Sequence, residues 1–210
     1  MTLQTGKLCA TVLGIALLGG ALSACAPIIL GGAAMGALVA TDRRTSGAQL
    51  EDEGIDLRGA GRVREALGDR VHVNVTSYNR QVLLTGEVPN AQDKQQVEQI
   101  VSRVENVRSI INELAIMGNT SLTQRSSDSL VTGKVKAAMV DSKDIYANSF
   151  KVVTERGTVY LMGRVTQREA ERATEITRST SGVQRVVRVL EIISEEELQR
   201  TRPAQAAPKP

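Results

Sequence analysis

Residues 73–88 read VNVTSYNRQVLLTGEV, and residues 150–165 read FKVVTERGTVYLMGRV. When the two stretches are aligned, Gly86 of the first matches Gly163 of the second. Each stretch alternates apolar and polar residues, passes through a turn, and alternates again. This pattern predicts a β-hairpin with one buried face. Two hairpins of the same design predict that the chain contains two copies of one domain.

Four residues of the hairpins have specific backbone roles in this interpretation. Asn79 and Gly157 lie in the two predicted turns, where residues that tolerate a positive φ are favoured. Gly86 and Gly163 lie near the ends of the second strands. We expect both to be structural glycines, at positions where a side chain would collide with a neighbouring backbone. A bulky residue at either position should destabilise its own domain.

The sequence around each hairpin is helical in pattern. Val97, Ile100, Val101 and Val104 have the spacing of one helix face, and the second copy carries a counterpart. A further helix precedes each hairpin, and a third strand follows the second helix. The helix before the second hairpin is expected to open after residues 127–129 (SDS), which are good N-cap residues. Each copy therefore predicts an α+β fold, a two-layer α-β-β-α-β sandwich with a three-stranded mixed sheet.

These patterns divide the chain into six segments. The expected segments are a signal peptide (1–24), a lipidated, flexible Gly/Ala-rich tether (25–49), a first domain (50–116), a polar linker (117–127), a second domain (128–193) and a disordered tail (194–210).

The N-terminal segment predicts export and lipidation. It has a charged start, an uncharged and mostly apolar run, and small residues before a cleavage point, as secretory signals do. Residues 22–25 read LSAC and resemble a bacterial lipobox. That resemblance implies cleavage before Cys25 and a diacylglyceryl thioether on its thiol. The alternative is an uncleaved transmembrane helix, because uncharged sequence continues to Thr41 and a span needs about 20 apolar residues. Pro27 and the glycines at 31–32 interrupt that run.

Composition argues against several classes of function. After cleavage Cys25 is the only cysteine, so no intramolecular disulfide can form. The net charge of +3 comes from interleaved acids and bases, and there are only three Tyr, one Phe and no Trp, so nucleic-acid binding is not expected. His72 is the only histidine, and no nucleophile motif accompanies it. We predict a protein that is not an enzyme and has neither a cofactor nor a metal site.

The repeated units resemble BON domains. Each copy has a glycine ending its second strand and a Val-centred turn after its second helix, at residues 105–107 and 181–183. Together with the lipobox and the short tether, they resemble outer-membrane lipoproteins with tandem BON domains. The resemblance implies an outer-membrane protein that is lipid-anchored on the periplasmic face, and Ala26 after the cysteine favours the same membrane. It also implies a non-catalytic protein that binds anionic phospholipid and supports outer-membrane integrity under envelope stress.

In this family the second domain contacts lipid through its first helix, which corresponds here to residues 129–140. Where the family carries a tryptophan near the start of that helix, this chain has Leu130. The expected phospholipid-binding residues are Leu130, Val131, Lys134 and Ala137. From the residues alone, Leu130, Lys134 and Ala137 share one helix face, and an apolar residue beside lysines suits an anionic membrane. The alternative is that Leu130 packs against the linker and the lysines are only solvated.

Two other functions remain open at this point. One is a protein-interaction adaptor, in which an exposed sheet face recruits envelope-assembly or cell-division proteins. The other is a mechanical spacer between the outer membrane and periplasmic structures. The first domain's helix is expected to follow a run of acids that starts at Glu51 and ends at Asp56. Such a run is a poor surface for anionic lipid, so the two copies should differ in role.

Overall fold

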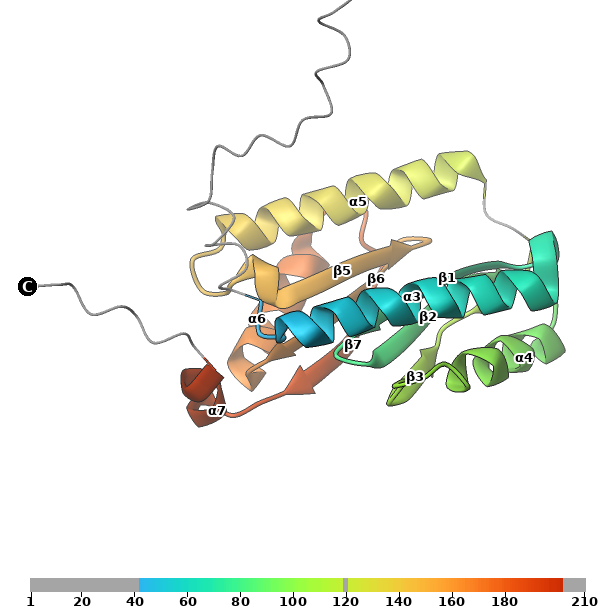
Figure 1. Cartoon of the computed structure of the whole chain (residues 1–210). Coiled ribbons are helices and arrows are strands. Elements are labelled where there is room, and N and C mark those ends of the chain that lie inside the picture. The colour runs from blue at the N-terminus through green and yellow to red at the C-terminus, as the bar shows by residue number, and fades with distance from the viewer. Residues whose placement is uncertain (1–41, 119–120, 202–210) are drawn as a thin grey trace, which may run out of the picture. The chain divides into compact units, whose positions relative to one another are not determined.

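A computed structural model describes residues 42–118 and 121–201 (Figure 1). The expected signal peptide, Cys25, most of the expected tether and residues 202–210 lie outside the described residues. All described residues belong to one compact unit, and its buried clusters contain only residues between Ile55 and Leu190. A fragment of residues 26–210 therefore keeps every residue of these cores.

The order of elements in both copies confirms the predicted fold class. The first copy consists of α3 (Ser46–Leu67), β1 (His72–Tyr78), β2 (Gln81–Val88), α4 (Ala91–Ser102), β3 (Ser109–Asn112) and the short β4 (Ala115–Ile116). The second consists of α5 (Leu122–Asp141), β5 (Phe150–Glu155), β6 (Thr158–Val165), α6 (Gln167–Ser179) and β7 (Arg185–Ile192), followed by α7 (Glu195–Thr201). Short 3₁₀ turns occur at Gly68–Arg70 and Ala147–Ser149.

Both sheets are mixed. β2 pairs antiparallel with β1 through the hairpin and parallel with β3, and β4 also pairs parallel with β2. The first sheet therefore has a short fourth strand in addition to the three expected. In the second copy β6 pairs antiparallel with β5 and parallel with β7. The parallel pairs follow from the chain order, because a parallel neighbour needs a crossover and α4 and α6 supply it.

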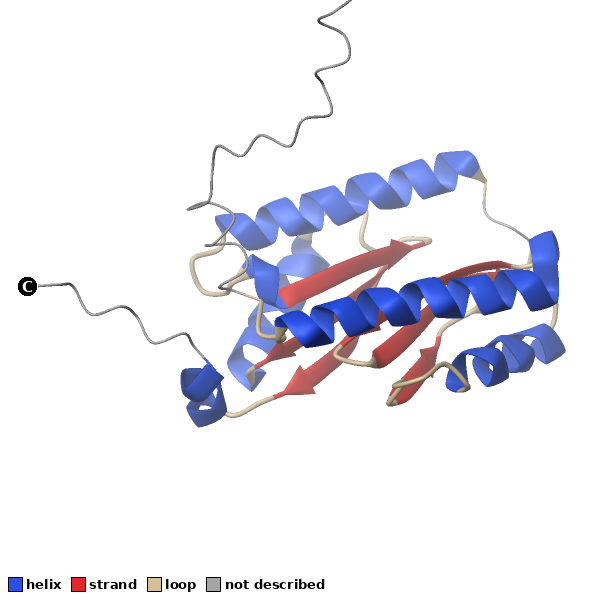
Figure 2. Cartoon of the chain, in the orientation of Figure 1, coloured by secondary structure: helices blue, strands red, loops and turns tan. Residues whose placement is uncertain are grey.

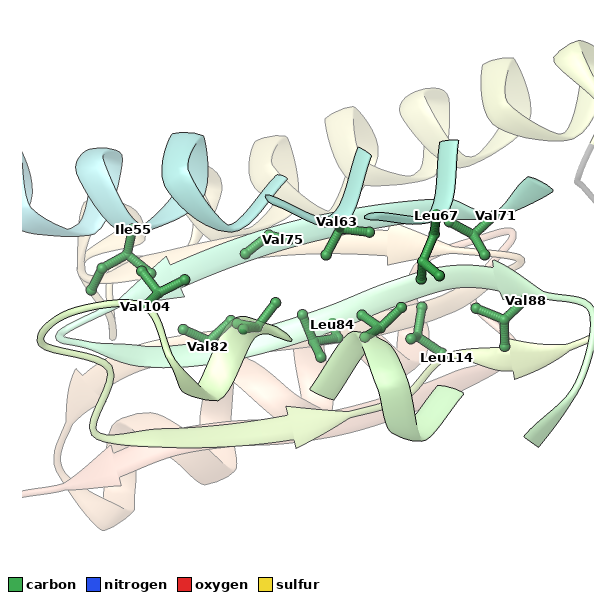
Figure 3. Packing of buried hydrophobic residues seen from close by; sticks show 12 residues of the cluster. Ile55, Val63, Leu67, Val71, Val75, Val82, Leu84, Val88, Val104 and Leu114 are labelled. Atoms are coloured by element: carbon green, nitrogen blue, oxygen red, sulfur yellow. The ribbon is translucent and has the colours of Figure 1, made fainter. Parts of the chain in front are cut away.

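Each sheet packs one face against its own helices. Figure 3 shows Ile55, Val63 and Leu67 of α3 over the strand residues of the first copy, which include Val75 and Leu84. The corresponding cluster of the second copy joins α5 and α6 to their sheet; it includes Val131, Val135, Met139, Val159, Leu161, Ala173 and Ile176. The aliphatic composition of both clusters agrees with a chain that has few aromatic residues.

The opposite faces of the two sheets pack against each other, so the expectation of one buried face per hairpin is wrong. A third cluster joins Tyr78 and Leu83 of the first sheet to Tyr160, Met162 and Val189 of the second. The central strands β2 and β6 are consequently buried on both faces over most of their length. In Figure 2, α5 runs along the top of the strands and α3 passes in front of them. The consecutive apolar residues at 82–84 of β2 and 159–162 of β6 were the available signal for this contact, because a strand buried on both faces has a continuous apolar run.

A buried aspartate ties the first helix of each copy to its hairpin turn. In the first copy the Asp52 carboxylate accepts hydrogen bonds from the backbone N–H groups of Asn79 (2.7 Å) and Arg80 (2.8 Å). Both turn residues have a positive φ, of 50° and 64°, as type I′ hairpin turns require. Asp52 also accepts a hydrogen bond from Ser77 Oγ at 2.7 Å. The carboxylate thus fixes both the turn and the position of α3.

In the second copy the same role belongs to Asp128, and this corrects the expected linker. α5 begins at Leu122, because the Ser121 side chain caps it, so residues 122–127 are helical. Asp128 is therefore inside the helix and is not part of its N-cap. Its carboxylate accepts hydrogen bonds from the backbone N–H groups of Arg156 (2.8 Å) and Gly157 (2.9 Å). The sequence pattern was misleading because the partners of Asp128 lie in the distant hairpin.

The helix α3 also begins earlier than expected, at Ser46 with Thr45 as its N-cap. The acids from Glu51 to Asp56 are therefore part of this helix and do not precede it. The segment before it is docked as well, although it was assigned to the tether. Arg43 forms two hydrogen bonds of 2.7 Å with Glu169 of the second copy, and the two side chains are 7% and 2% exposed.

The next residue binds the first copy. Arg44 pairs with Asp52 at 2.8 Å, and its guanidinium lies 4.2 Å from the centre of the Tyr78 ring. Burial raises the pKa of Tyr78 to about 12. The last described residues before α3 therefore contact both copies and help to hold them together.

The expected disordered tail is helical at its start. α7 covers Glu195–Thr201, Leu198 is buried, and the Glu197 side chain pairs with Arg164 of β6. The run of three glutamates at residues 195–197 stands in the first turn of α7, where negative charge is favoured.

The two hairpin glycines stand where the backbone of the neighbouring strand comes close. A Cβ at Gly86 would lie 2.1 Å from the His72 carbonyl oxygen, and Gly86 also has a φ of +111°. A Cβ at Gly163 would lie 2.5 Å from the Ser149 carbonyl oxygen. Both contacts involve backbone atoms that cannot rotate away, so each strand end accepts only glycine without a shift of the chain.

We expect Gly163→Ala to lower the free energy of unfolding by about 1–3 kcal/mol, because the added methyl group overpacks a backbone contact. Thermal and urea unfolding of the 26–210 fragment would measure the change. Gly61→Ala is the matched control, since a Cβ there meets nothing within 4 Å. It should raise stability by about 0.5–1 kcal/mol, as removal of a helical glycine does. Equal effects of the two substitutions would contradict the role given to Gly163.

The Asp52 carboxylate makes stability depend on pH. Burial alone would raise the pKa of Asp52, but hydrogen bonds from Ser77, Arg80 and Arg44 hold it below its ordinary value. A lowered pKa contributes stability above the unfolded value, about 4, and this stability is lost as the pH falls through the folded value.

Asp52→Asn should therefore lower the free energy of unfolding at neutral pH by on the order of 3 kcal/mol, the range for hydrogen bonds to a charged group. The difference from the parent should shrink as the pH falls below about 4, because the unfolded parent is protonated there and the folded parent is protonated at still lower pH. Urea unfolding across this pH range tests it, with the exposed Glu53→Gln as control. If Asp52→Asn lowered the free energy of unfolding by the same amount at all pH values, the charge of Asp52 would not be the cause of the lost stability.

Candidate membrane-binding surface

The outer side of α5 carries a row of exposed apolar and small residues. Leu122 is 79% exposed, Leu130 69% and Val140 70%. Gly133 and Ala137 are also exposed and lie on the same side of the helix, since residues three, four and seven apart share a face. We call these five residues the α5 stripe. Scattered single leucines on a surface are ordinary, whereas a row along one helix marks a candidate interaction site.

The exposed charges along the α5 stripe are positive, and the exposed acids Asp141 and Asp144 follow only after Val140. Lys134 and Lys136 are exposed on its two flanks, and Lys143 is exposed just beyond the end of the helix. Asp128 is the only acid between Leu122 and Val140, and it is 4% exposed and bound to the hairpin turn. An apolar row bordered by lysines is complementary to an anionic membrane surface, where each nearby lysine contributes about 1 kcal/mol.

The structure separates the four residues expected to bind phospholipid. Leu130, Lys134 and Ala137 are exposed on the outer side of α5. Val131 is 5% exposed and belongs to the core of the second copy, so its assignment as a lipid-binding residue is wrong. The next residue along a helix is rotated by about 100°, which turns Val131 inward when Leu130 faces out. The alternative in which Leu130 packs against the linker disagrees with its exposure.

Sequence reasoning missed three members of the α5 stripe. Leu122 was expected in the linker, and Gly133 and Val140 were not assigned to the site. The signal for them was the helical spacing of Leu122, Leu130, Ala137 and Val140. It could be recognised only once the helix was known to begin at Leu122.

The equivalent helix of the first copy has a different surface. Leu50 and Leu57 of α3 are 70% and 77% exposed, so an apolar row exists there too. However, Glu53 and Glu65 are exposed on the same helix, and Glu51 and Asp56 are half-buried. These acids lie among the exposed Arg62 and Arg64, so α3 carries charges of both signs where α5 carries lysines. This difference supports the expectation that the two copies differ in role.

His72 is only partly exposed. Its side chain is 22% exposed, and Nδ1 lies 2.9 Å from the fully buried carboxylate of Glu87. Within residues 42–118 and 121–201, no group of three or more His, Cys, Asp or Glu residues is arranged to hold a metal ion. None of the helices in those two ranges is both long and apolar enough to cross a membrane.

Comparison with known proteins identifies the repeated unit. The model of the BON domain family matches residues 56–118 and again residues 127–194. The two matches correspond to the two copies seen in the structure and together cover more than half of the chain.

Two relatives match over most of the chain. The outer membrane lipoprotein DolP of Haemophilus influenzae is 36% identical over 195 residues, which are 92% of this chain and 100% of that protein. A 21 kDa hemolysin of Actinobacillus pleuropneumoniae is 30% identical over 154 residues, 72% of this chain and 79% of the relative. Neither match is to an enzyme family.

Among solved structures, CdsD, a structural protein of the type III secretion system of Chlamydia trachomatis, aligns with 76% of this chain and 99% of that chain. The identity is 15% and the TM-score is 0.30, a likeness too low to support an argument. The match to DolP, by contrast, spans the whole relative and supports an outer-membrane location for this protein. With its two BON domains in tandem, the chain belongs to the BON-domain family as a relative of the outer-membrane lipoprotein DolP.

Proposed function

We propose that this protein is a non-catalytic lipoprotein that is anchored through Cys25 on the periplasmic face of the outer membrane. It binds anionic phospholipid through α5 of the second BON domain, and this binding supports outer-membrane integrity under envelope stress. The observation that carries the proposal is the α5 stripe, an exposed apolar row with lysines on both flanks and no exposed acid along its length.

The energies involved favour a weak contact supported by an anchor. Full burial of a leucine side chain contributes about 1.5–3 kcal/mol, and residues inserted into the interface are buried only in part. Two lysines add about 1 kcal/mol each near an anionic surface. The sixteen residues between Cys25 and Asp42 span at most about 60 Å when fully extended. An acylated Cys25 would therefore keep α5 at a high effective concentration next to the membrane.

The adaptor function would need a surface other than the one first considered. It required an exposed sheet face, and the sheet faces of the two domains pack against each other around Tyr78 and Tyr160. Envelope-assembly or division proteins would have to bind a helix face or a sheet edge. The charge pattern along α5 favours lipid over such proteins as its partner.

A double substitution tests lipid binding by α5. Leu130→Glu with Lys134→Glu removes an apolar contact and reverses a charge, so co-sedimentation of the 26–210 fragment with phosphatidylglycerol vesicles should fall at least about tenfold. The matched control is Leu57→Glu with Arg64→Glu on α3, which changes the same residue classes at exposed positions. Binding should survive in the control. Equal binding by the parent and the α5 variant would refute the proposed surface.

The anchor is tested on the full-length chain. Intact-mass analysis of the mature protein should show the acyl modification and the loss of residues 1–24, and cell fractionation should place it with outer membranes. Cys25→Ala should remove the added mass and release the protein from that fraction. Retention of the variant in the membrane without added mass would point to an uncleaved helix instead of a lipid anchor.

A further inference from the structure

A polar pocket lies between the two BON domains, along one flank of α5. Its volume is about 330 Å³. It is lined from the first domain by His72 and Asn74 of β1, and from the second by Arg125, Asp128, Ser129 and Thr132 of α5 and by Thr154 and Glu155 of β5. All of these side chains are polar, so the pocket differs from the hydrophobic clusters on either side of the sheets.

Arg125 brings an unpaired positive charge to this pocket. Its Nε is buried without a hydrogen-bond partner, and no ion pair of its guanidinium is found among the described residues. Asp128, one turn further along α5, is already engaged by the backbone N–H groups of Arg156 and Gly157. An arginine stays protonated at any physiological pH. Its guanidinium, which suits planar two-point binding of phosphate, is therefore available for an anionic group.

Glu155 brings a carboxylate that forms no ion pair in the part of the chain that the structure describes. This carboxylate accepts a hydrogen bond from the neutral Asn74 side chain at 3.2 Å. Burial, together with the charge of nearby Glu87, raises the pKa of Glu155. A bound ammonium group would reverse this effect by favouring the ionised carboxylate.

The pocket adjoins the α5 stripe. Ser129 lines the pocket and directly precedes Leu130, while Arg125 stands three residues, about one turn, after Leu122. A phospholipid whose acyl chain lies against the α5 stripe would thus have its headgroup within reach of Arg125. Headgroup and chain would then be held by adjacent sides of the same helix.

We propose that this pocket binds the zwitterionic phosphoethanolamine headgroup of a phospholipid, with its phosphate on Arg125 and its ammonium on Glu155. The proposal rests on the proposed function, since it places the headgroup of a lipid that contacts α5. A free phosphate or a glycerol headgroup would satisfy Arg125 and leave two carboxylates, Asp128 and Glu155, facing an anion. A headgroup with one charge of each sign matches both unpaired groups. The lysines beside the α5 stripe would still supply the attraction to anionic lipid.

Soluble headgroups test the pocket without a membrane. In an NMR titration of the 26–210 fragment, O-phosphoethanolamine should shift the amide signals of Ser129 and Asn74 saturably. Inorganic phosphate, ethanolamine and phosphocholine should bind at least about tenfold more weakly, because each lacks one of the two charge-assisted contacts. Arg125→Ala and Glu155→Gln should each abolish the saturable shifts. Arg178→Ala removes the same charge from an exposed position of α6 and should leave them unchanged.

Vesicle binding then tests whether the pocket recognises the headgroup of a lipid in a membrane. At a fixed minor fraction of phosphatidylglycerol, the fragment should bind more tightly when the remaining lipid is phosphatidylethanolamine than when it is phosphatidylcholine. Arg125→Ala should remove this preference and keep the binding to phosphatidylglycerol.

Two results would overturn the proposal: equal titration by inorganic phosphate and O-phosphoethanolamine, or an ethanolamine preference that survives in Arg125→Ala. The variant carrying Leu130→Glu and Lys134→Glu separates the two proposals. It should lose vesicle binding, because the α5 stripe is altered, and still bind soluble O-phosphoethanolamine. If only the headgroup titration fails, the pocket proposal is wrong and the proposed lipid binding by the α5 stripe is unaffected.

Discussion

The contact between the two sheets is the constraint on which the rest of the structure depends. It buries Leu83 of β2 and Tyr160 and Met162 of β6, so the central strand of each domain is covered on both faces. Small sheets with helices on one side leave an apolar face that must be buried against another layer. Because each domain supplies that cover for the other, the outer surfaces of the helices are what remains for a partner. This is why α5, and not a sheet face, presents the candidate membrane surface.

The same contact explains how two copies of one design can take different roles. Both copies use a buried aspartate, Asp52 or Asp128, to hold a helix on a type I′ turn, so their frameworks are equivalent. Residues outside the framework are free to differ, and they do so in charge. The outer side of α3 carries exposed glutamates as well as arginines, whereas that of α5 has lysines and no exposed acid between its first leucine and Val140. The interdomain pocket also exists only because the sheets meet, since its lining comes from both domains.

Much of the candidate site could be predicted from the sequence, and the errors have physical causes. Leu130, Lys134 and Ala137 were assigned correctly to the outer side of a helix, because helical spacing alone determines which residues share a face. Val131 was assigned to that surface although it faces the core. Leu122 was missed because Ser127 and Asp128 looked like a helix start. Asp128 instead bonds to a turn 28 residues away, and no local rule contains that information.

By itself the sequence determined the repeat, the order of elements, the turns and the strand-end glycines, and it predicted the lipobox at Cys25. These features follow from local periodicity, backbone preferences and short motifs, which are properties of neighbouring residues. Only the tertiary structure decided that the two sheets share a core, that Arg43 and Arg44 dock the segment before α3, and that Arg125 and Glu155 line one pocket. The physical reason is that burial and ion pairing depend on which distant residues meet, and that depends on the packing of the whole fold.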